Sequence, residues 1–222
     1  MALVVKKKQI KFGRKVCVSS TGYSLLDRGS TGQASESELY CLSDVAEDKT
    51  KASVCWIPPP SDSLKINCDG AFFAESKSGG WGFVIRDNEG AVRGSGAGFI
   101  SHAASAAQVE AQACAEALQA AACWGMGRLI VESDARNVIN ALSGTTLDLT
   151  PEGVIYRDIR VFSRLNFLSV DFGFCPRSCN KLAHHELAAL GARRRGVQSL
   201  WLESLPDFPN VPVASVLSEP II

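Results

Sequence analysis

The sequence has no long apolar run. No stretch approaches the ~18 consecutive apolar residues that a membrane-spanning helix requires, so we expect no transmembrane segment and no membrane partner. The short apolar start, MALVV, is followed directly by lysines, which is not the pattern of a secretory signal.

An excess of either charge is also missing, because 23 basic side chains balance 23 acidic ones. The neutral sum hides an uneven distribution. Residues 1–20 carry six basic side chains and no acid, whereas residues 21–62 carry seven acids against three bases. The basic start indicates either a nuclear or organelle-targeting segment or a solvated tail, and the sequence leaves these alternatives open.

The sequence lacks a regular disulfide framework, although it contains eight cysteines. A chain of this length does not need disulfides to fold, so we interpret the cysteines as free thiols in a reducing, intracellular compartment. Cys175 and Cys179 precede the pair His184 and His185, which raises the question of a zinc site. Adjacent residues of a helix point about 100° apart, so this spacing does not favour zinc.

The chain divides into three parts. Residues 1–54 have no sustained periodicity and are rich in Ser, Gly, Lys and Glu, which predicts disorder. A domain is predicted over 55–196, introduced by the proline-rich stretch CWIPPPSDS. Residues 197–222 alternate proline with apolar residues and are predicted to be a C-terminal tail.

Within the domain the hydrophobic period changes from that of strands to that of helices. Strands are expected at 64–73, 80–87, 90–99, 128–133 and 167–174, and helices at 105–125, 134–142, 151–165 and 178–192. Three closely spaced strands followed by α/β alternation predict an α/β fold: a mixed five-stranded sheet, with three antiparallel strands first, flanked by helices.

Three carboxylates stand out against this pattern. Asp69 lies in the middle of a hydrophobic strand, where a buried carboxylate costs several kcal/mol unless it is paired or bound to a metal. Asp134 directly follows a strand, at the end where open α/β sheets place ligands. If these acids meet Glu110 of the first long helix, two Mg²⁺ or Mn²⁺ ions would relieve their repulsion, an arrangement used for phosphodiester cleavage.

The choice of the helix glutamate rests on helical geometry. Glu110 and Glu116 are six residues apart, about 240° around the helix, so only one can face the sheet. Small side chains surround Glu110, which favours that residue. The alternatives are ordinary: Asp69 at a turn before Gly70, Glu110 on a solvated face, and Asp134 as a helix N-cap.

Five segments, WIPPPSDSLKINCDGAF, GGWGFVIRDNEGAVRGSG, QVEAQACAEALQAA, LIVESDARNVINAL and RSCNKLAHHELAALG, occur in that order over residues 55–192. Together they resemble the ribonuclease H-like domain of plant proteins related to retrotransposon polyproteins. The resemblance implies a five-stranded mixed sheet with helices. It also implies that Asp69, Glu110 and Asp134 bind two Mg²⁺ ions, and that the substrate is the RNA strand of an RNA/DNA hybrid.

The fourth position of the family site departs from its usual pattern. Active ribonucleases H usually have Asp in the last helix, in a pattern like N-x-x-A-D, whereas this chain has His184 after Ala183. An insertion of one residue would fit the pattern equally well, so His184, His185 or Glu186 could hold the position. A histidine there could relay protons, but it does not supply the charge of an Asp.

Two functions remain open on this sequence. The first is a metal-dependent endonuclease that acts on RNA/DNA hybrids as a monomer. The second is a domesticated, hydrolytically weak domain that binds nucleic acid or a protein, since the fourth acid is replaced and the loop SGTTLDLT carries no basic residue. Three consecutive arginines, 193–195, follow the last helix as a phosphate contact or as a solvated helix end.

Overall fold

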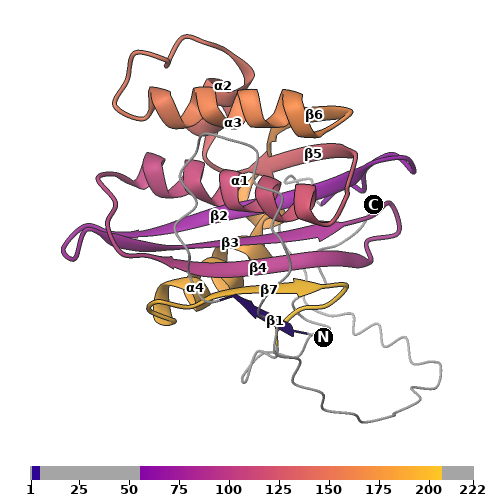
Figure 1. Cartoon of the computed structure of the whole chain (residues 1–222), viewed down its shortest axis with the longest axis horizontal. Helices are drawn as coiled ribbons and strands as arrows, with labels where there is room; N and C mark the ends of the chain where they lie inside the picture. The colour runs from indigo at the N-terminus through magenta and orange to yellow at the C-terminus, as the bar shows by residue number, and fades with distance from the viewer. Residues whose placement is uncertain (1, 6–55, 207–222) are drawn as a thin grey trace, which may run out of the picture.

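The computed structural model describes residues 2–5 and 56–206 (Figure 1). Its strands are β1 (Ala2–Val5), β2 (Leu64–Phe73), β3 (Ser78–Arg86), β4 (Val92–Ile100), β5 (Arg128–Ser133), β6 (Ser169–Phe174) and β7 (Gln198–Leu202). Its helical segments are α1 (Ala106–Cys123), α2 (Arg136–Ser143), α3 (Gly153–Asn166), the short 3₁₀ turn η1 (Arg177–Cys179), the π-helix η2 (Leu182–Ala188) and α4 (Ala189–Arg193).

All strands belong to one mixed sheet in the order β1-β7-β4-β3-β2-β5-β6. The pairs β2–β5 and β5–β6 are parallel, and the remaining pairs are antiparallel. The mixed α/β fold and the five strands expected from the sequence are confirmed, but the sheet is wider than expected. Both extra strands, β1 and β7, lie in segments that the sequence analysis placed outside the domain; the rest of those segments, 6–54 and 207–222, falls outside the described residues.

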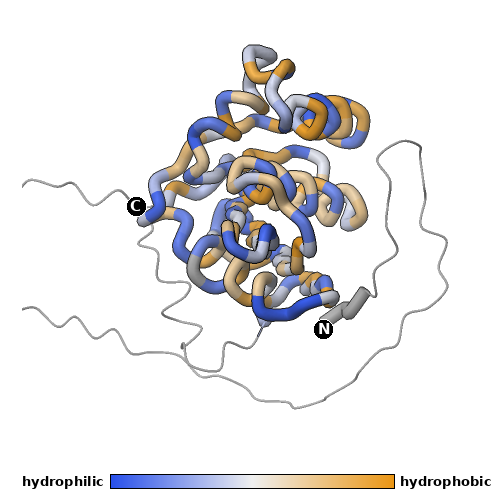
Figure 2. Tube along the Cα trace, turned by 90° about the vertical axis from the view of Figure 1, so that its left-hand side faces the viewer, coloured by the Kyte–Doolittle hydropathy of each residue, from blue (hydrophilic) through white to orange (hydrophobic). Residues whose placement is uncertain are grey.

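Strand β2 separates the two faces of the sheet by simple alternation. Ile66 and Cys68 point into the main core together with the alanine-rich face of α1. Asn67 and Asp69 point to the other face, where η2 and α4 lie. Figure 1 shows α1 over β2, α2 and α3 next to β6 at the top of the view, and α4 beside β7 near the lower edge of the sheet. Figure 2 shows hydrophilic and hydrophobic stretches alternating along the chain.

The proline-rich lead-in is anchored by Trp56, which is 1% exposed. Its indole Nε1 donates a hydrogen bond of 2.8 Å to Asn67 Oδ1, and the Arg86 guanidinium lies 3.9 Å from its ring centroid. Cys175 and Cys179 complete this small buried cluster. Because the indole packs on a strand that carries Asp69, the lead-in supports the sheet beside that residue.

The last helix differs from the single regular helix predicted over 178–192. It begins with the 3₁₀ turn η1, continues as the π-helix η2 and ends as the short helix α4. The helix lies close to the strands because glycines face it. A Cβ atom on Gly82 would collide with the backbone of Ala188, and one on Gly80 would collide with that of Ala192. The backbone approach fixes the height of the helix above the sheet.

Two helix starts also differ from the prediction. Helix α2 begins at Arg136 with Ala135 as its N-cap and has no side-chain cap, so Asp134 does not act as the cap. Helix α3 begins at Gly153 rather than at Pro151. Across the described residues, no helix has both the length and the apolar character that crossing a membrane requires.

Candidate active site

Asp69 lies in the middle of β2, opposite Gly82 of β3, and is 1% exposed. Its Oδ2 is 3.0 Å from Nδ1 of His184 on η2. Gly82 has no side chain, so η2 can approach the sheet closely enough for this contact. A strand in the centre of the sheet and a helix pressed onto it therefore hold the two side chains together.

Asp134 reaches the same place from the end of β5. Its Oδ1 accepts a hydrogen bond of 3.3 Å from Asn180 Nδ2, and its Oδ2 accepts one of 2.9 Å from Arg177 Nε. Ligand-type atoms of Asp69, Asp134 and His184 all lie within 4.8 Å of one another. Two predicted acids and one of the three candidates for the fourth position thus meet in one cluster.

Glu110 approaches this cluster from the other face of the sheet. Gly70 allows helix α1 to come close, since a Cβ atom there would lie 2.8 Å from the backbone N of Glu110. The Glu110 Oε2 atom accepts a hydrogen bond of 3.0 Å from the Gly70 N–H. Strand β5 ends at Ser133 while β2 continues to Phe73, so the carboxylate lies beside the part of β2 that β5 does not cover.

The alternative glutamate lies elsewhere. Glu116 accepts hydrogen bonds from Gln112 Nε2, at 2.8 Å, and from Gln198 Nε2, at 2.9 Å. It therefore links α1 to β7. The charge of Glu110, by contrast, acts on Asp69, and the charge of Asp134 acts on Glu110.

The three acids strongly perturb one another. Burial, then the charges of Glu110 and Asp134, raise the pKa of Asp69 to about 10. Burial, then the charge of Asp134, raises the pKa of Glu110 to about 8. Burial also opposes the charge of Asp134, but hydrogen bonds from Asp69 and Arg177 hold its pKa below the ordinary value.

This donor set fits a divalent cation. Carboxylate oxygens are the preferred ligands of Mg²⁺ and Mn²⁺, and an imidazole nitrogen is compatible with several divalent metals. Clustered carboxylates that are buried and repel one another are relieved by a cation as they are by protons. Asp69, Asp134 and His184 present the closest set of ligand atoms, with Glu110 next to it.

The metal-free protein is expected to lose stability as the pH rises. The folded-state pKa values of about 10 for Asp69 and about 8 for Glu110 lie above the ordinary values of 3.8 and 4.5. Between the ordinary and the raised values, the unfolded chain binds fewer protons than the folded chain. The free energy of unfolding then falls by at most about 1.4 kcal/mol per pH unit for each proton released.

Urea unfolding in EDTA, from about pH 5 to about pH 9, measures this slope. A saturating divalent cation should flatten it, since the cation then takes the place of the protons. A free energy of unfolding that stays constant or rises over this range would contradict the coupling of the acids.

Two further residues of the site were not singled out in the sequence. Arg177 is exposed, and its guanidinium pairs with Asp134 at 2.9 Å. Asn180 is fully buried and donates to both Cys68 O, at 3.1 Å, and Asp134 Oδ1. Asn180 is the first residue of the N-x-x-A-D pattern, but that pattern gave it no role in the site. Arg177 precedes it in RSCN with no sequence signal of its own.

The π-helix determines which of the candidates for the fourth position, His184, His185 or Glu186, reaches the acids. It places the His184 imidazole at Asp69, whereas Glu186 is not among the residues of the ligand cluster. A π-helix forms i→i+5 hydrogen bonds and so accommodates one more residue than an α-helix between partners. The histidine pair is thus accommodated while Leu187 and Ala188 remain buried against the sheet.

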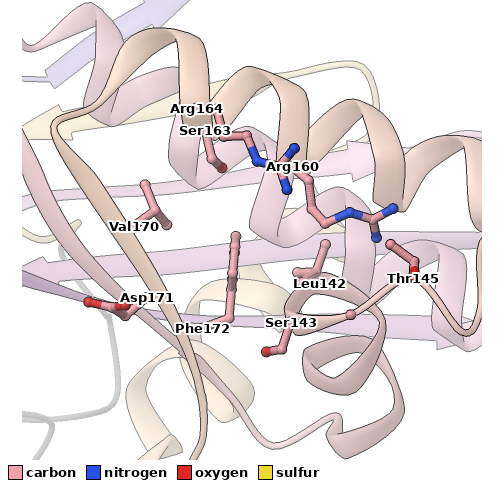
Figure 3. Close-up of a pocket in the computed structure, with 10 residues that line it drawn as sticks. Leu142, Ser143, Thr145, Arg160, Ser163, Arg164, Val170, Asp171 and Phe172 are labelled. Atoms are coloured by element: carbon pink, nitrogen blue, oxygen red, sulfur yellow. The ribbon is translucent and has the colours of Figure 1, made fainter.

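A separate pocket of about 390 Å³ lies between the end of α2, helix α3 and strand β6 (Figure 3). Arg160 lines it but is already engaged, because its guanidinium donates to Ala141 O and to Asp148 Oδ1. None of the clustered acids lines this pocket. We therefore assign the pocket no part in the site.

Comparison with known proteins places this geometry in context. A family model described as "Reverse transcriptase-like" matches residues 67–190, more than half of the chain and the whole of the acid cluster. No curated protein matches the chain.

Three solved structures have the same fold. The first is the N-terminal RNase H domain of rv2228c from Mycobacterium tuberculosis, at 21% identity and a TM-score of 0.53, covering 58% of this chain and 92% of that one. An RNase H1 isolated from compost by a metagenomic approach has 20% identity and a TM-score of 0.54, covering 59% and 95%. The same compost enzyme in complex with an RNA/DNA hybrid has 20% identity and a TM-score of 0.52, covering 57% and 94%.

The match over residues 67–190, which includes every acid of the cluster, shows that this chain belongs to the reverse transcriptase-like family, with a domain of RNase H-like fold.

Proposed function

We propose that this protein is a divalent-metal-dependent endonuclease that hydrolyses the RNA strand of RNA/DNA hybrids. The observation that carries the proposal is the convergence of Asp69, Glu110 and Asp134 beside His184. The fold supports it, and one structure of similar fold is an RNase H1 in complex with an RNA/DNA hybrid.

The residues of the site would have two roles, to hold the cation and to transfer a proton. Asp69, Glu110 and Asp134 would hold the cation, and His184 would complete the set. A bound divalent cation, Mg²⁺ or Mn²⁺ and two ions in the fullest form, would activate the attacking water and stabilise charge on the leaving oxygen. Hydrolysis adds the water oxygen to phosphorus and breaks the bond to the 3′ oxygen, leaving a 3′-hydroxyl and a 5′-phosphate.

His184 has a position suited to moving a proton. Its Nδ1 atom lies 3.0 Å from Asp69 Oδ2, which fixes the orientation of the ring. Either ring nitrogen of a histidine can carry a proton near neutral pH. It contributes less negative charge than a fourth carboxylate would. We therefore expect the protein to bind its cations more weakly than a four-carboxylate site and to respond more strongly to the choice between Mg²⁺ and Mn²⁺.

Recognition of the hybrid would depend on its shape. A-like duplexes present a wide, shallow minor groove with 2′-hydroxyl groups, which distinguish the RNA strand from DNA. The motifs of the chain also support an origin in plant retrotransposon-related polyproteins, and we propose that the protein acts as a monomer. The basic residues at the start of the chain, which indicate either a targeting segment or a solvated tail, lie outside the described residues.

A second function has a specific motivation. Because His184 stands where active relatives usually have Asp, the domain could bind hybrids without turnover. Binding of this kind would depend on salt but not on a catalytic cation.

The two glutamates of α1 provide a matched test. With Mg²⁺ or Mn²⁺, the parent protein should cleave a labelled RNA/DNA hybrid, and Glu110→Gln should reduce the rate by about a hundredfold or more, as expected for the loss of a metal-holding group. Glu116→Gln changes the charge of the same helix by the same amount, but it should leave the rate within about twofold of the parent.

Each outcome of this test is informative. Equal losses in both variants would contradict the assignment of Glu110. No cleavage by a folded parent, together with salt-dependent hybrid binding, would replace the nuclease with the binding function.

A further inference from the structure

The densest group of exposed positive charge in the described chain is the arginine run, defined here as Arg193, Arg194 and Arg195. All three are exposed at the end of α4. Within residues 2–5 and 56–206, none of them forms an ion pair with an acid. By contrast, Arg160 and Arg177 are paired with Asp148 and Asp134.

The strands give the position of this run relative to the acid cluster. Gly82 pairs with Asp69, and a Cβ atom on Gly82 would touch the helix at Ala188. Two residues along the same strand, a Cβ atom on Gly80 would touch it at Ala192. Two residues of a strand span about 7 Å. The run therefore starts about 7 Å along the sheet from the level of Asp69, and on the same face.

The backbone beneath the run is well anchored. Gly191 packs against the backbone of Gly98. The N–H of Arg194 donates to Leu190 O and Gly191 O, each at 3.2 Å, and the N–H of Val197 donates to Arg194 O at 3.2 Å. The three side chains thus extend from an ordered backbone. When they bind a ligand, the backbone has little further conformational entropy to lose.

One of the three side chains also has an aromatic neighbour. The Arg195 guanidinium lies 5.9 Å from the centroid of the Phe99 ring, at the outer limit of a cation–π contact. Phe99 pairs with Gly80 of β3, the residue that contacts the helix at Ala192. The run, the end of β4 and the start of β3 therefore form one continuous surface.

We propose that the arginine run binds backbone phosphates of the nucleic acid beside the bond that is cleaved. This inference rests on the proposed function, because it takes the acid cluster as the point of cleavage. Arginine is suited to the role because its planar fork matches a phosphate in a bidentate manner. It also explains how a neutral chain, whose 143–150 loop has no basic residue, attracts a polyanion to an acidic site.

The expected contact lies a short distance along the duplex. The separation of about 7 Å along the sheet places the contacted phosphates next to the bond at Asp69. Contacts of this kind position the duplex and contribute to affinity, and they do not read the base sequence.

The test compares two charge-matched double variants of the full-length chain. Arg193→Gln/Arg194→Gln removes two charges from the run and leaves Arg195 at Phe99. Arg157→Gln/Arg164→Gln removes two charges from α3, on the α1 side of the sheet. Fluorescence anisotropy measures binding of a labelled RNA/DNA hybrid in EDTA between about 50 and about 200 mM salt, a range over which phosphate contacts change affinity strongly.

We expect the run variant to bind the hybrid at least about tenfold more weakly at low salt, because it lacks two charge-assisted hydrogen-bond donors. The slope of log K against log salt should become shallower by about 0.9 for each phosphate that the variant no longer neutralises. The α3 variant should retain the parent affinity and slope. In the cleavage assay, KM of the run variant should rise while kcat stays within about twofold, because these arginines position the substrate and do not react. Both variants should melt with the parent, since none of the four side chains is buried.

Other results would overturn the inference. Equal affinities and slopes for both variants, in a parent that binds and cleaves, would remove the run from the interface and leave the nuclease function intact. A parent that neither binds nor cleaves a hybrid would remove both proposals. Weaker binding to polyglutamate, with hybrid binding unchanged, would assign the run to an acidic protein instead.

Discussion

Replacing Asp69 by Asn is expected to abolish hybrid cleavage while making the metal-free protein more stable. The carboxylate is buried between two other acids, and its pKa of about 10 shows how strongly the folded chain opposes its charge. An amide of nearly the same shape keeps the packing and is neutral at every pH, so the folded chain no longer has to take up a proton to bury the group. It also removes the ligand atom that faces both Asp134 and His184.

The substitution should lower the cleavage rate and raise the stability of the metal-free protein, and each effect can be measured separately. Loss of a metal-holding carboxylate removes several kcal/mol of transition-state stabilisation, so the cleavage rate should fall at least about a thousandfold. At neutral pH, the melting temperature in EDTA should rise by about 2–4 °C for each kcal/mol that keeping Asp69 protonated costs the parent. Added Mg²⁺ should raise the melting temperature of the parent but not that of the variant.

A matched control is Asp171→Asn, because Asp171 is an exposed acid of β6 away from the cluster. It should change neither the rate nor the response to Mg²⁺. Cleavage by Asp69→Asn at the parent rate would contradict the role of Asp69 in holding a catalytic metal. A melting temperature below that of the parent in EDTA would contradict the cost of burying the carboxylate.

The second large effect is expected for Gly82→Ala. Gly82 faces η2 across from Asp69, and a methyl group there would collide with the backbone of Leu187 and Ala188 rather than with a flexible side chain. Overpacking of a core costs about 1–3 kcal/mol, and we expect the upper end because backbone atoms cannot turn away. The melting temperature should fall by about 6–12 °C.

The same change should also reduce cleavage, since lifting η2 separates His184 from Asp69. Gly173→Ala is the matched control. Gly173 lies in β6, where an added Cβ atom would meet Glu132 Cγ at an ordinary 3.7 Å. That control should be neutral or slightly stabilising, because alanine is less flexible than glycine in the unfolded chain. A Gly82→Ala protein as stable as the control would contradict the close packing of the last helix.

Sequence reasoning reached Asp134 because it directly follows a strand, and it reached Asp69 and Glu110 because each conflicts with its surroundings. Asp69 interrupts a hydrophobic strand, and Glu110 lies among alanines on a face that must approach the sheet. These are conflicts between composition and burial, which periodicity exposes. The order of strands and helices followed from the same periodicity, and so did the mixed sheet.

The features that sequence reasoning missed show no hydrophobic periodicity that would reveal them. Arg177 lies in a short 3₁₀ turn and Asn180 directly follows it, so the regular helix predicted over 178–192 did not indicate which of their side chains turns inward. Strand β7 is only five residues long and is followed by prolines, so its pairing with β4 is a tertiary effect. The π-helix was hidden for the opposite reason, because its sequence is typical of an ordinary helix.

The π-helix has a consequence for how this gene can change. Deleting the codon for His184 or the codon for His185 gives the same product, with Asn-Lys-Leu-Ala-His-Glu-Leu-Ala in place of the present segment. The shorter chain can pass between the same two anchors, Asn180 before it and the Leu187–Ala188 contact after it, as a plain α-helix. We expect the loss of one histidine codon here to be absorbed within a single turn, without movement of the sheet or of the acids. Length variation that would disrupt most helices becomes nearly silent at this point of the fold.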